Sequence, residues 1–130
     1  MATSPQFITT PKIGAASVST ANTNRDGTGT IATVFTAGAS GSKIEEVVVQ
    51  ATNDPADSTI TLFIYDGANY WLFDEIDIGN PAAASTTVAG YRTYKTYENL
   101  VLPTGYSLRA AITVALTAGV CNVFALGGDF

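Results

Sequence analysis

Four carboxylates in one short segment are the residues of this chain whose spacing could support catalysis. Asp66 precedes a group of acids at Asp74, Glu75 and Asp77, and a pair of carboxylic acids can hydrolyse a glycosidic bond. On a strand, alternate residues face opposite sides, so Glu75 and Asp77 share one face while Asp74 shares the other with Ile76. We interpret this pattern as the solvated side of a β-hairpin, with a carbohydrate or ion site as the second interpretation.

Few residues of the chain could support other kinds of catalysis or the binding of a metal ion. The chain contains no histidine, which excludes histidine-based triads and most zinc sites, and its single cysteine, Cys121, is expected to be a small buried hydrophobe. The loop from Asn22 to Gly27 places oxygen-bearing side chains at alternate positions, as a calcium loop does, but Thr33 stands where the bidentate Glu would be. We interpret it as a turn held by Asx hydrogen bonds, and we expect no catalytic residue, no metal site and no cofactor.

Aromatic side chains offer a different chemistry, because rings on an exposed β surface can stack on the faces of sugar rings. The chain has six Tyr, six Phe and one Trp. Aromatic residues on strands lie more often in a core or an interface, so glycan binding is the alternative interpretation of these residues. The candidates for a sugar-stacking surface are Tyr70, Trp71, Tyr91, Tyr94 and Tyr97.

Strands must position these residues, because apolar residues recur with a period of two and no helical stripe is present. Ile60, Leu62 and Ile64 alternate with residues of the opposite face, and aromatic residues follow the turn at 66–69, so residues 58–78 are expected to form a β-hairpin. The pattern predicts a single-domain, all-β antiparallel sandwich, jelly-roll-like, with eight or nine strands. The other expected strands are 15–20, 30–36, 43–51, 91–97, 100–102, 106–117 and 120–125.

Residues 1–13 are expected to form an extended N-terminal arm, and residues 14–130 the sandwich domain. Pro5 and Pro11 argue against a helix in the arm. Phe7 and Ile8 would be costly to leave in water, so we expect them, together with Lys12, to contact another subunit or a larger assembly. The arm is then dispensable for folding and needed for attachment or subunit contacts.

The composition points to a surface that is partly covered by other subunits. Charged residues make up 13% of the 130 positions, about half of the usual share, which predicts a buried subunit interface. The six basic residues stand singly and the net charge is −5, so we expect no nucleic-acid binding. The N-terminus lacks a cationic start and an apolar run, which predicts synthesis in the cytoplasm without a signal peptide, and no apolar stretch is long enough for a membrane span.

Four segments together resemble a group of small tailed-phage virion proteins: residues 22–29 (NTNRDGTG), 63–67 (FIYDG), 102–110 (LPTGYSLRA) and the terminal GGDF. The resemblance extends over most of the chain, from about Ala21 to Phe130, and includes no catalytic signature. It implies a non-enzymatic β-sandwich protein of the virion, and it favours a capsid decoration (cement) protein that forms homotrimers on the outer head surface. The implied partner is the major capsid protein, with Phe7, Ile8 and Lys12 as contact residues. A tail- or fibre-associated subunit is the alternative.

Overall fold

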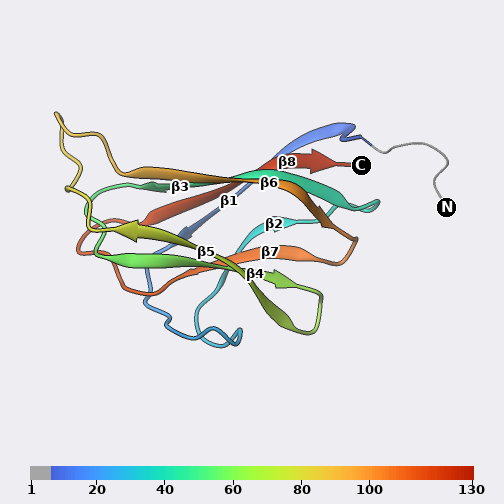
Figure 1. Ribbon diagram of the computed structural model, residues 1–130, viewed down its shortest axis with the longest axis horizontal. Helices are drawn as coiled ribbons and strands as arrows, with labels where there is room; N and C mark the ends of the chain where they lie inside the picture. Colours follow the sequence, from blue (N-terminus) through green and yellow to red (C-terminus); the bar gives the residue numbers. More distant parts are fainter. Residues whose placement is uncertain (1–6) are drawn as a thin grey trace.

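The alternating segments of the sequence form eight β-strands in a computed structural model, which describes residues 7–130 (Figure 1). None of these residues lies in a helix, and therefore none lies in a helix that could cross a membrane. The strands are β1 (Thr10–Val18), β2 (Ala32–Thr36), β3 (Ser42–Ala51), β4 (Ser58–Tyr65), β5 (Tyr70–Gly79), β6 (Arg92–Leu102), β7 (Ser107–Ile112) and β8 (Cys121–Asp129).

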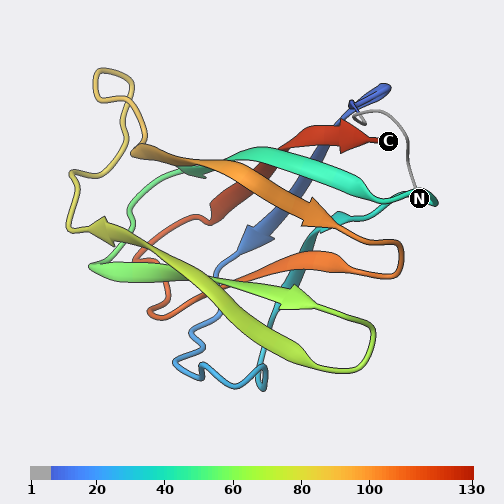
Figure 2. The ribbon, with the colours of Figure 1, turned by 45° about the vertical axis from the view of Figure 1, so that its right-hand side comes forward.

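The strands pair as one long hairpin that is folded over on itself. β1 pairs with β8, β2 with β7, β3 with β6 and β4 with β5, all antiparallel. Two further pairings, β3 with β8 and β4 with β7, complete sheet A (β1-β8-β3-β6) and sheet B (β2-β7-β4-β5). This connectivity is that of a jelly roll, so the predicted fold class is confirmed. Figure 2 shows the two sheets stacked, with the loop between β5 and β6 projecting at one end.

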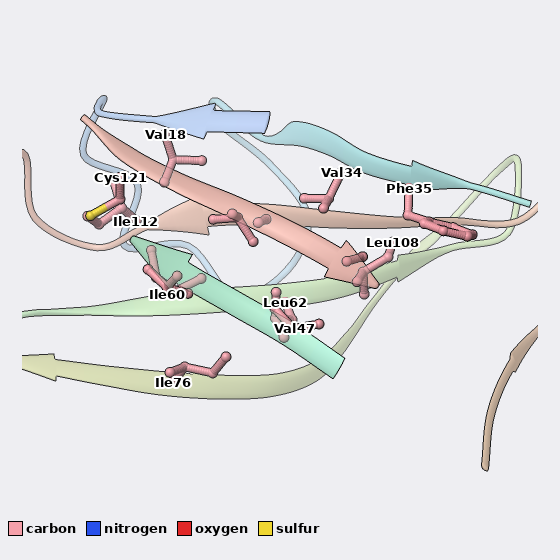
Figure 3. Close-up of a cluster of buried hydrophobic side chains, with 14 of the residues drawn as sticks. Val18, Val34, Phe35, Val47, Ile60, Leu62, Ile76, Leu108, Ile112 and Cys121 are labelled. Atoms are coloured by element: carbon pink, nitrogen blue, oxygen red, sulfur yellow. The ribbon is translucent and has the colours of Figure 1, made fainter. Parts of the chain in front are cut away.

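The core fills the space between the two sheets. The residues that alternate inward on β4, Ile60 and Leu62, are fully buried, and they meet Val47 of β3 from the opposite sheet (Figure 3). Cys121 is buried in this core, as predicted, and the burial raises the pKa of its thiol. The side chains of the strand faces directed away from this core are therefore the ones available for function.

The first strand begins earlier than the sequence indicated. β1 starts at Thr10, so residues 10–13, assigned above to the arm, pair with residues 126–129 of β8 and belong to sheet A. Pro11 is accommodated because β1 is an edge strand, where the missing N–H need not serve a second neighbour. Just before β1, the N–H of Thr9 donates to the carbonyl of Asp129 at 3.0 Å.

The last strand is longer than predicted because two glycines continue it. β8 passes through Gly127 and Gly128 to Asp129, whereas the sequence suggested an end near Ala125. Glycine is depleted in strands and therefore suggests an end. At Gly127 the absence of a side chain is required, because a Cβ would lie 1.9 Å from the carbonyl oxygen of Lys43.

Two further boundaries differ from the prediction. The expected strands 91–97 and 100–102 are one strand, β6, whose pairing with β3 shifts register between Ile44 and Glu46. β7 ends at Ile112 although apolar alternation continues to residue 117. The chain leaves the ladder there, and the carbonyl of Ile112 accepts the N–H of Asn22 at 2.8 Å.

Candidate functional site

The four acids of the β4–β5 hairpin do not converge on one site. Asp74 lies between the sheets at their open edge, where its carboxylate is 2.7 Å from the Nζ atom of Lys95 and accepts a hydrogen bond from the hydroxyl of Tyr97 at 2.9 Å. Burial raises the pKa of Asp74, but hydrogen bonds from Lys95, the Glu75 backbone and Tyr97 outweigh it, so the pKa is lowered. Burial and the Asp74 carboxylate raise the pKa of Tyr97. Asp74 therefore ties β5 of sheet B to β6 of sheet A.

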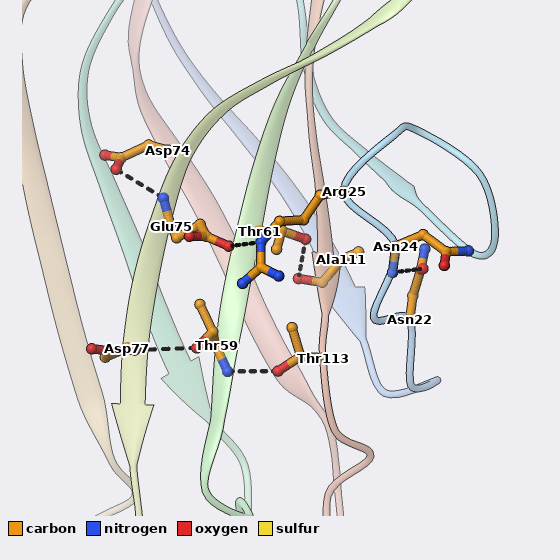
Figure 4. A network of polar contacts seen from close by, with 10 residues as sticks. All are labelled: Asn22, Asn24, Arg25, Thr59, Thr61, Asp74, Glu75, Asp77, Ala111 and Thr113. Carbon is orange, nitrogen blue, oxygen red and sulfur yellow. Dashed lines mark hydrogen bonds and ion pairs between the residues drawn. The ribbon is translucent and has the colours of Figure 1, made fainter.

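The other three acids each have a partner of their own. Glu75 and Asp77 point to the exposed face of β5, as the alternation predicted, and accept hydrogen bonds from Arg25 at 2.7 Å and from Thr59 at 3.1 Å (Figure 4). Asp66 caps the hairpin turn, where backbone N–H groups of the turn, Asn69 first among them, and the Trp71 indole lower its pKa. The spatial arrangement thus supports the interpretation of these acids as structural.

The loop that resembles a calcium loop uses its oxygen atoms internally. The buried amide of Asn22 donates to the carbonyls of Thr28 and Thr30 and accepts the N–H of Asn24 (Figure 4). Asp26 accepts two hydrogen bonds from Thr28, which lower its pKa. The predicted Asx turn is confirmed, and nowhere in residues 7–130 do three His, Cys, Asp or Glu side chains gather as metal ligands.

The same loop, residues 19–31, folds over the outer face of sheet B. Arg25 reaches Glu75 of β5, and Gly27 approaches Tyr70 so closely that a Cβ would lie 2.3 Å from that of Tyr70. Gly27 also has a φ of 90°, which glycine tolerates best. Outward-facing side chains of β4 and β7 are buried, although they do not face the core: Thr61, Phe63 and Ala111.

The aromatic residues predicted as a sugar-stacking surface do not form one. Tyr70 lies on the outer face of sheet B and Tyr94 on the outer face of sheet A. Tyr91 and Tyr97 pack against the core, and Trp71 is exposed at the edge of β5 with its indole N–H on Asp66.

The structure instead assembles a cluster that contains Tyr70 and three residues not singled out from the sequence. Arg109 of β7 lies with its guanidinium 4.1 Å from the ring centre of Tyr65. Its Nε atom donates to the Ser107 hydroxyl at 3.0 Å, and its Nη1 atom donates to the Tyr70 hydroxyl at 2.9 Å. Phe63 lies beneath, edge-on to Tyr70 with ring centres 6.1 Å apart. We refer to Tyr65, Tyr70, Ser107 and Arg109 as the Arg109 cluster.

The outer face of sheet A presents a different chemistry. Register places Ala15, Phe124, Val48 and Tyr94 side by side across all four strands, on the face away from the core. Ile13 and Leu126 form the adjacent pair along β1 and β8. We call these six residues the apolar row. A shallow hollow of about 520 Å³ adjoins it, lined by residues that include Ile13, Leu126 and Glu46.

The expected contact residues near the N-terminus separate into two kinds. Phe7 is 75% exposed, and Ile8 lies against the backbone of Gly128. Lys12, in contrast, is engaged within its own chain, because its Nζ atom donates to the Thr36 carbonyl at 2.5 Å and lies 3.4 Å from the Asp129 carboxylate. Of the three, Phe7 is the side chain that remains most available to another molecule.

Comparisons with protein-family models, with curated proteins and with solved structures return no match for this chain.

Proposed function

We propose that this chain is a non-enzymatic structural protein of a tailed-phage virion, and that it decorates the outer surface of the head as a cement protein. The observation that carries the proposal is the apolar row. Ile13 and Tyr94 are 69% and 59% exposed, and burying a side chain such as Ile13 against a partner contributes about 1.5 to 3 kcal/mol. A face of this kind on a chain of low charge is suited to docking on a larger assembly.

Two other features support the same role. The resemblance of residues 22–29, 63–67 and 102–110 to small virion proteins implies it. The hairpin acids that could have served catalysis are held by structural partners: Lys95 for Asp74 and Arg25 for Glu75. The chain then acts by binding and does not need a reaction centre.

The mechanism of such a protein is thermodynamic linkage. A subunit that binds the assembled shell and not its separated parts stabilises the shell by mass action. The partner is the major capsid protein, and we propose a homotrimer in which the apolar row of each subunit faces the shell and Phe7 extends to a neighbour. Three linked contacts give an avidity that one contact lacks.

This proposal can be tested with particles that lack the protein, to which purified protein is added back. Heating or osmotic shock should spare more particles when wild-type protein is bound. The double variant Ile13→Ser with Tyr94→Ser removes the exposed ends of the apolar row. Its matched control is Val88→Ser with Val114→Ser, since both valines are exposed but lie outside the row.

The row variant should fail to bind and to protect, while the control behaves as wild type. Equal retention of the two double variants would show that the row is not the docking surface. Equal survival with and without any of these proteins would refute the cementing role itself. If labelled protein is found on the tail or on a fibre and not on the head, the alternative of a tail- or fibre-associated subunit is supported.

Glycan binding is the second candidate function, and the Arg109 cluster is the observation that favours it. The cluster combines an aromatic pair, Tyr65 and Tyr70, whose ring centres are 4.5 Å apart, with a guanidinium. An array of glycans probed with the wild-type protein tests this class of function, and the absence of any specific signal would remove it.

A further inference from the structure

Arg109 differs from the other basic residues of the chain in its surroundings. Four of the six have a carboxylate within 4 Å: Lys12, Arg25, Lys43 and Lys95. In the part of the chain that the structure describes, Arg92 and Arg109 have none. Arg92 is exposed near the ring of Tyr94, whereas Arg109 is half-buried against the rings of Tyr65 and Tyr70. A guanidinium keeps its charge at any pH that proteins experience, so a half-buried one favours an anion beside it.

The donors of Arg109 are only partly used by the protein. Two of its five N–H groups are accounted for, by the hydroxyls of Ser107 and Tyr70. The Nη2 atom has no acceptor within residues 7–130. Every fully buried side-chain nitrogen and oxygen of the described residues has a hydrogen-bond partner, so Nη2, which has none there, is not fully buried. The guanidinium is therefore held by Ser107 and Tyr70 and keeps contact with solvent at Nη2.

We propose that the Arg109 cluster binds the carboxylate of an acidic saccharide. The free edge of a guanidinium matches a planar carboxylate with two parallel N–H···O bonds. The hydroxyl of Tyr70 accepts a bond from Arg109, so its own proton is left to donate to the ligand. The contact with the Tyr65 ring and the two hydrogen bonds hold the guanidinium in place, which reduces the ordering that binding would otherwise require.

The rim of the cluster favours a sugar over a protein side chain as the source of the carboxylate. Gly27 lies against Tyr70, and its neighbours in the chain, Asp26 and Thr28, are exposed. The Oδ1 atom of Asp26 and the Thr28 hydroxyl are used within the loop, but the Oδ2 atom of Asp26 has no hydrogen-bond partner within residues 7–130 and can accept a hydrogen bond from a saccharide hydroxyl. A protein partner would instead require a well-packed apolar centre, and that chemistry lies on the apolar row of the opposite sheet.

The orientation of the site follows from the proposed function. The apolar row and the Arg109 cluster lie on the outer faces of opposite sheets, which Figure 2 shows stacked. If sheet A faces the shell, the Arg109 cluster faces away from the particle, where saccharides of a cell surface can reach it. The binding itself does not depend on the shell, so it can be tested with the isolated protein.

Titration of isotope-labelled protein with 3′-sialyllactose, followed by NMR, tests the proposal, with lactose as the neutral probe and sodium phosphate as the inorganic anion. We expect saturable shifts at Arg109 and Tyr70 with sialyllactose, and affinity at least about tenfold lower for lactose and phosphate. Arg109→Gln should weaken sialyllactose binding about tenfold or more, and Tyr70→Phe, which keeps the ring, several-fold. Arg92→Gln is the matched control and should bind as wild type.

Three results would overturn the proposal. The first is no saturable binding of either sialyllactose or a glucuronate-terminated disaccharide. The second is phosphate binding as tight as sialyllactose binding, which would indicate an anion site without saccharide recognition. The third is equal loss in Arg109→Gln and Arg92→Gln. Thermal melts of each variant establish that it is folded, and should Arg109→Gln not fold, Tyr70→Phe decides alone. None of these results bears on whether the apolar row binds a capsid.

Discussion

Replacing Phe63 by Ala tests whether loop 19–31 covers sheet B in solution. Phe63 is on the face of β4 that points away from the core, yet its side chain is fully buried. Tyr70 contacts its ring edge-on, and Gly27 of the loop lies against Tyr70. If this cover persists in solution, Phe63 behaves like a core residue although it does not face the other sheet.

The expected size of the effect follows from that burial. Truncation of a fully buried Phe to Ala costs about 3 to 5 kcal/mol in the free energy of unfolding. At roughly 2.1 cal/mol/K of unfolding entropy per residue, a chain of 130 residues changes by about 0.27 kcal/mol per degree. Phe63→Ala should therefore lower the melting temperature by about 11 to 18 °C.

Phe73 supplies the matched control, since it is the same residue type on the neighbouring strand but is 40% exposed against Tyr97. Phe73→Ala should cost only about 1 kcal/mol, or roughly 4 °C. Calorimetry or circular dichroism melts of the two variants measure the difference. A shift for Phe63→Ala no larger than that for Phe73→Ala would show that Phe63 is not buried beneath Tyr70 in solution.

Three further predictions concern the edges of the sandwich and its assembly. Deletion of residues 2–7 should leave the melting temperature nearly unchanged, whereas deletion of residues 2–13 removes the first pairs of β1 with β8 and should cost on the order of 1 to 3 kcal/mol; equal melts would show that this pairing does not contribute. The lowered pKa of Asp74 means that its ionised form stabilises the fold; this contribution is complete above about pH 4 and is lost as the pH falls through the lowered pKa. Wild-type protein should therefore lose more stability than Asp74→Asn between pH 5 and pH 2. Parallel losses of stability in the two proteins would contradict this. Light scattering of purified protein should give the mass of a trimer, and a monomer at micromolar concentration would contradict a trimer that forms without the capsid.

The sequence predicts the fold well where apolar residues that face the core recur at every second position of a strand. The alternation of Ile60, Leu62 and Ile64 predicts β4, because one face of that strand packs against the core. The turn at Asp66 and Gly67 then predicts that β5 pairs with it. Prediction fails where the close approach of two backbone segments, distant in the sequence, determines the structure. The low strand propensity of glycine suggests that β8 ends before Gly127. The carbonyl oxygen of Lys43, from another part of the chain, lies so close to Gly127 that no side chain fits there.

The candidate site could be predicted only in part, for a related reason. Tyr70 was recognisable as an aromatic residue on an exposed hairpin. Arg109 could not be predicted, because it stands 39 positions from Tyr70 in the sequence. The two residues meet only because β7 and β5 both pair with β4, one on each side of it. The burial of Phe63 could not be predicted either, since Tyr70 packs edge-on against it and the loop that lies on Tyr70 is held by a contact of Arg25 with Glu75, 50 positions apart.

We propose that this chain decorates the outside of a phage head, and this can be tested by electron microscopy of intact particles made from the genome that encodes it. Jelly-roll density is expected in clusters of three on the outer head surface, with sheet A toward the shell and the Arg109 cluster outward. Density for this chain in the tail or in a fibre, or its absence from the particles, would contradict the proposed role.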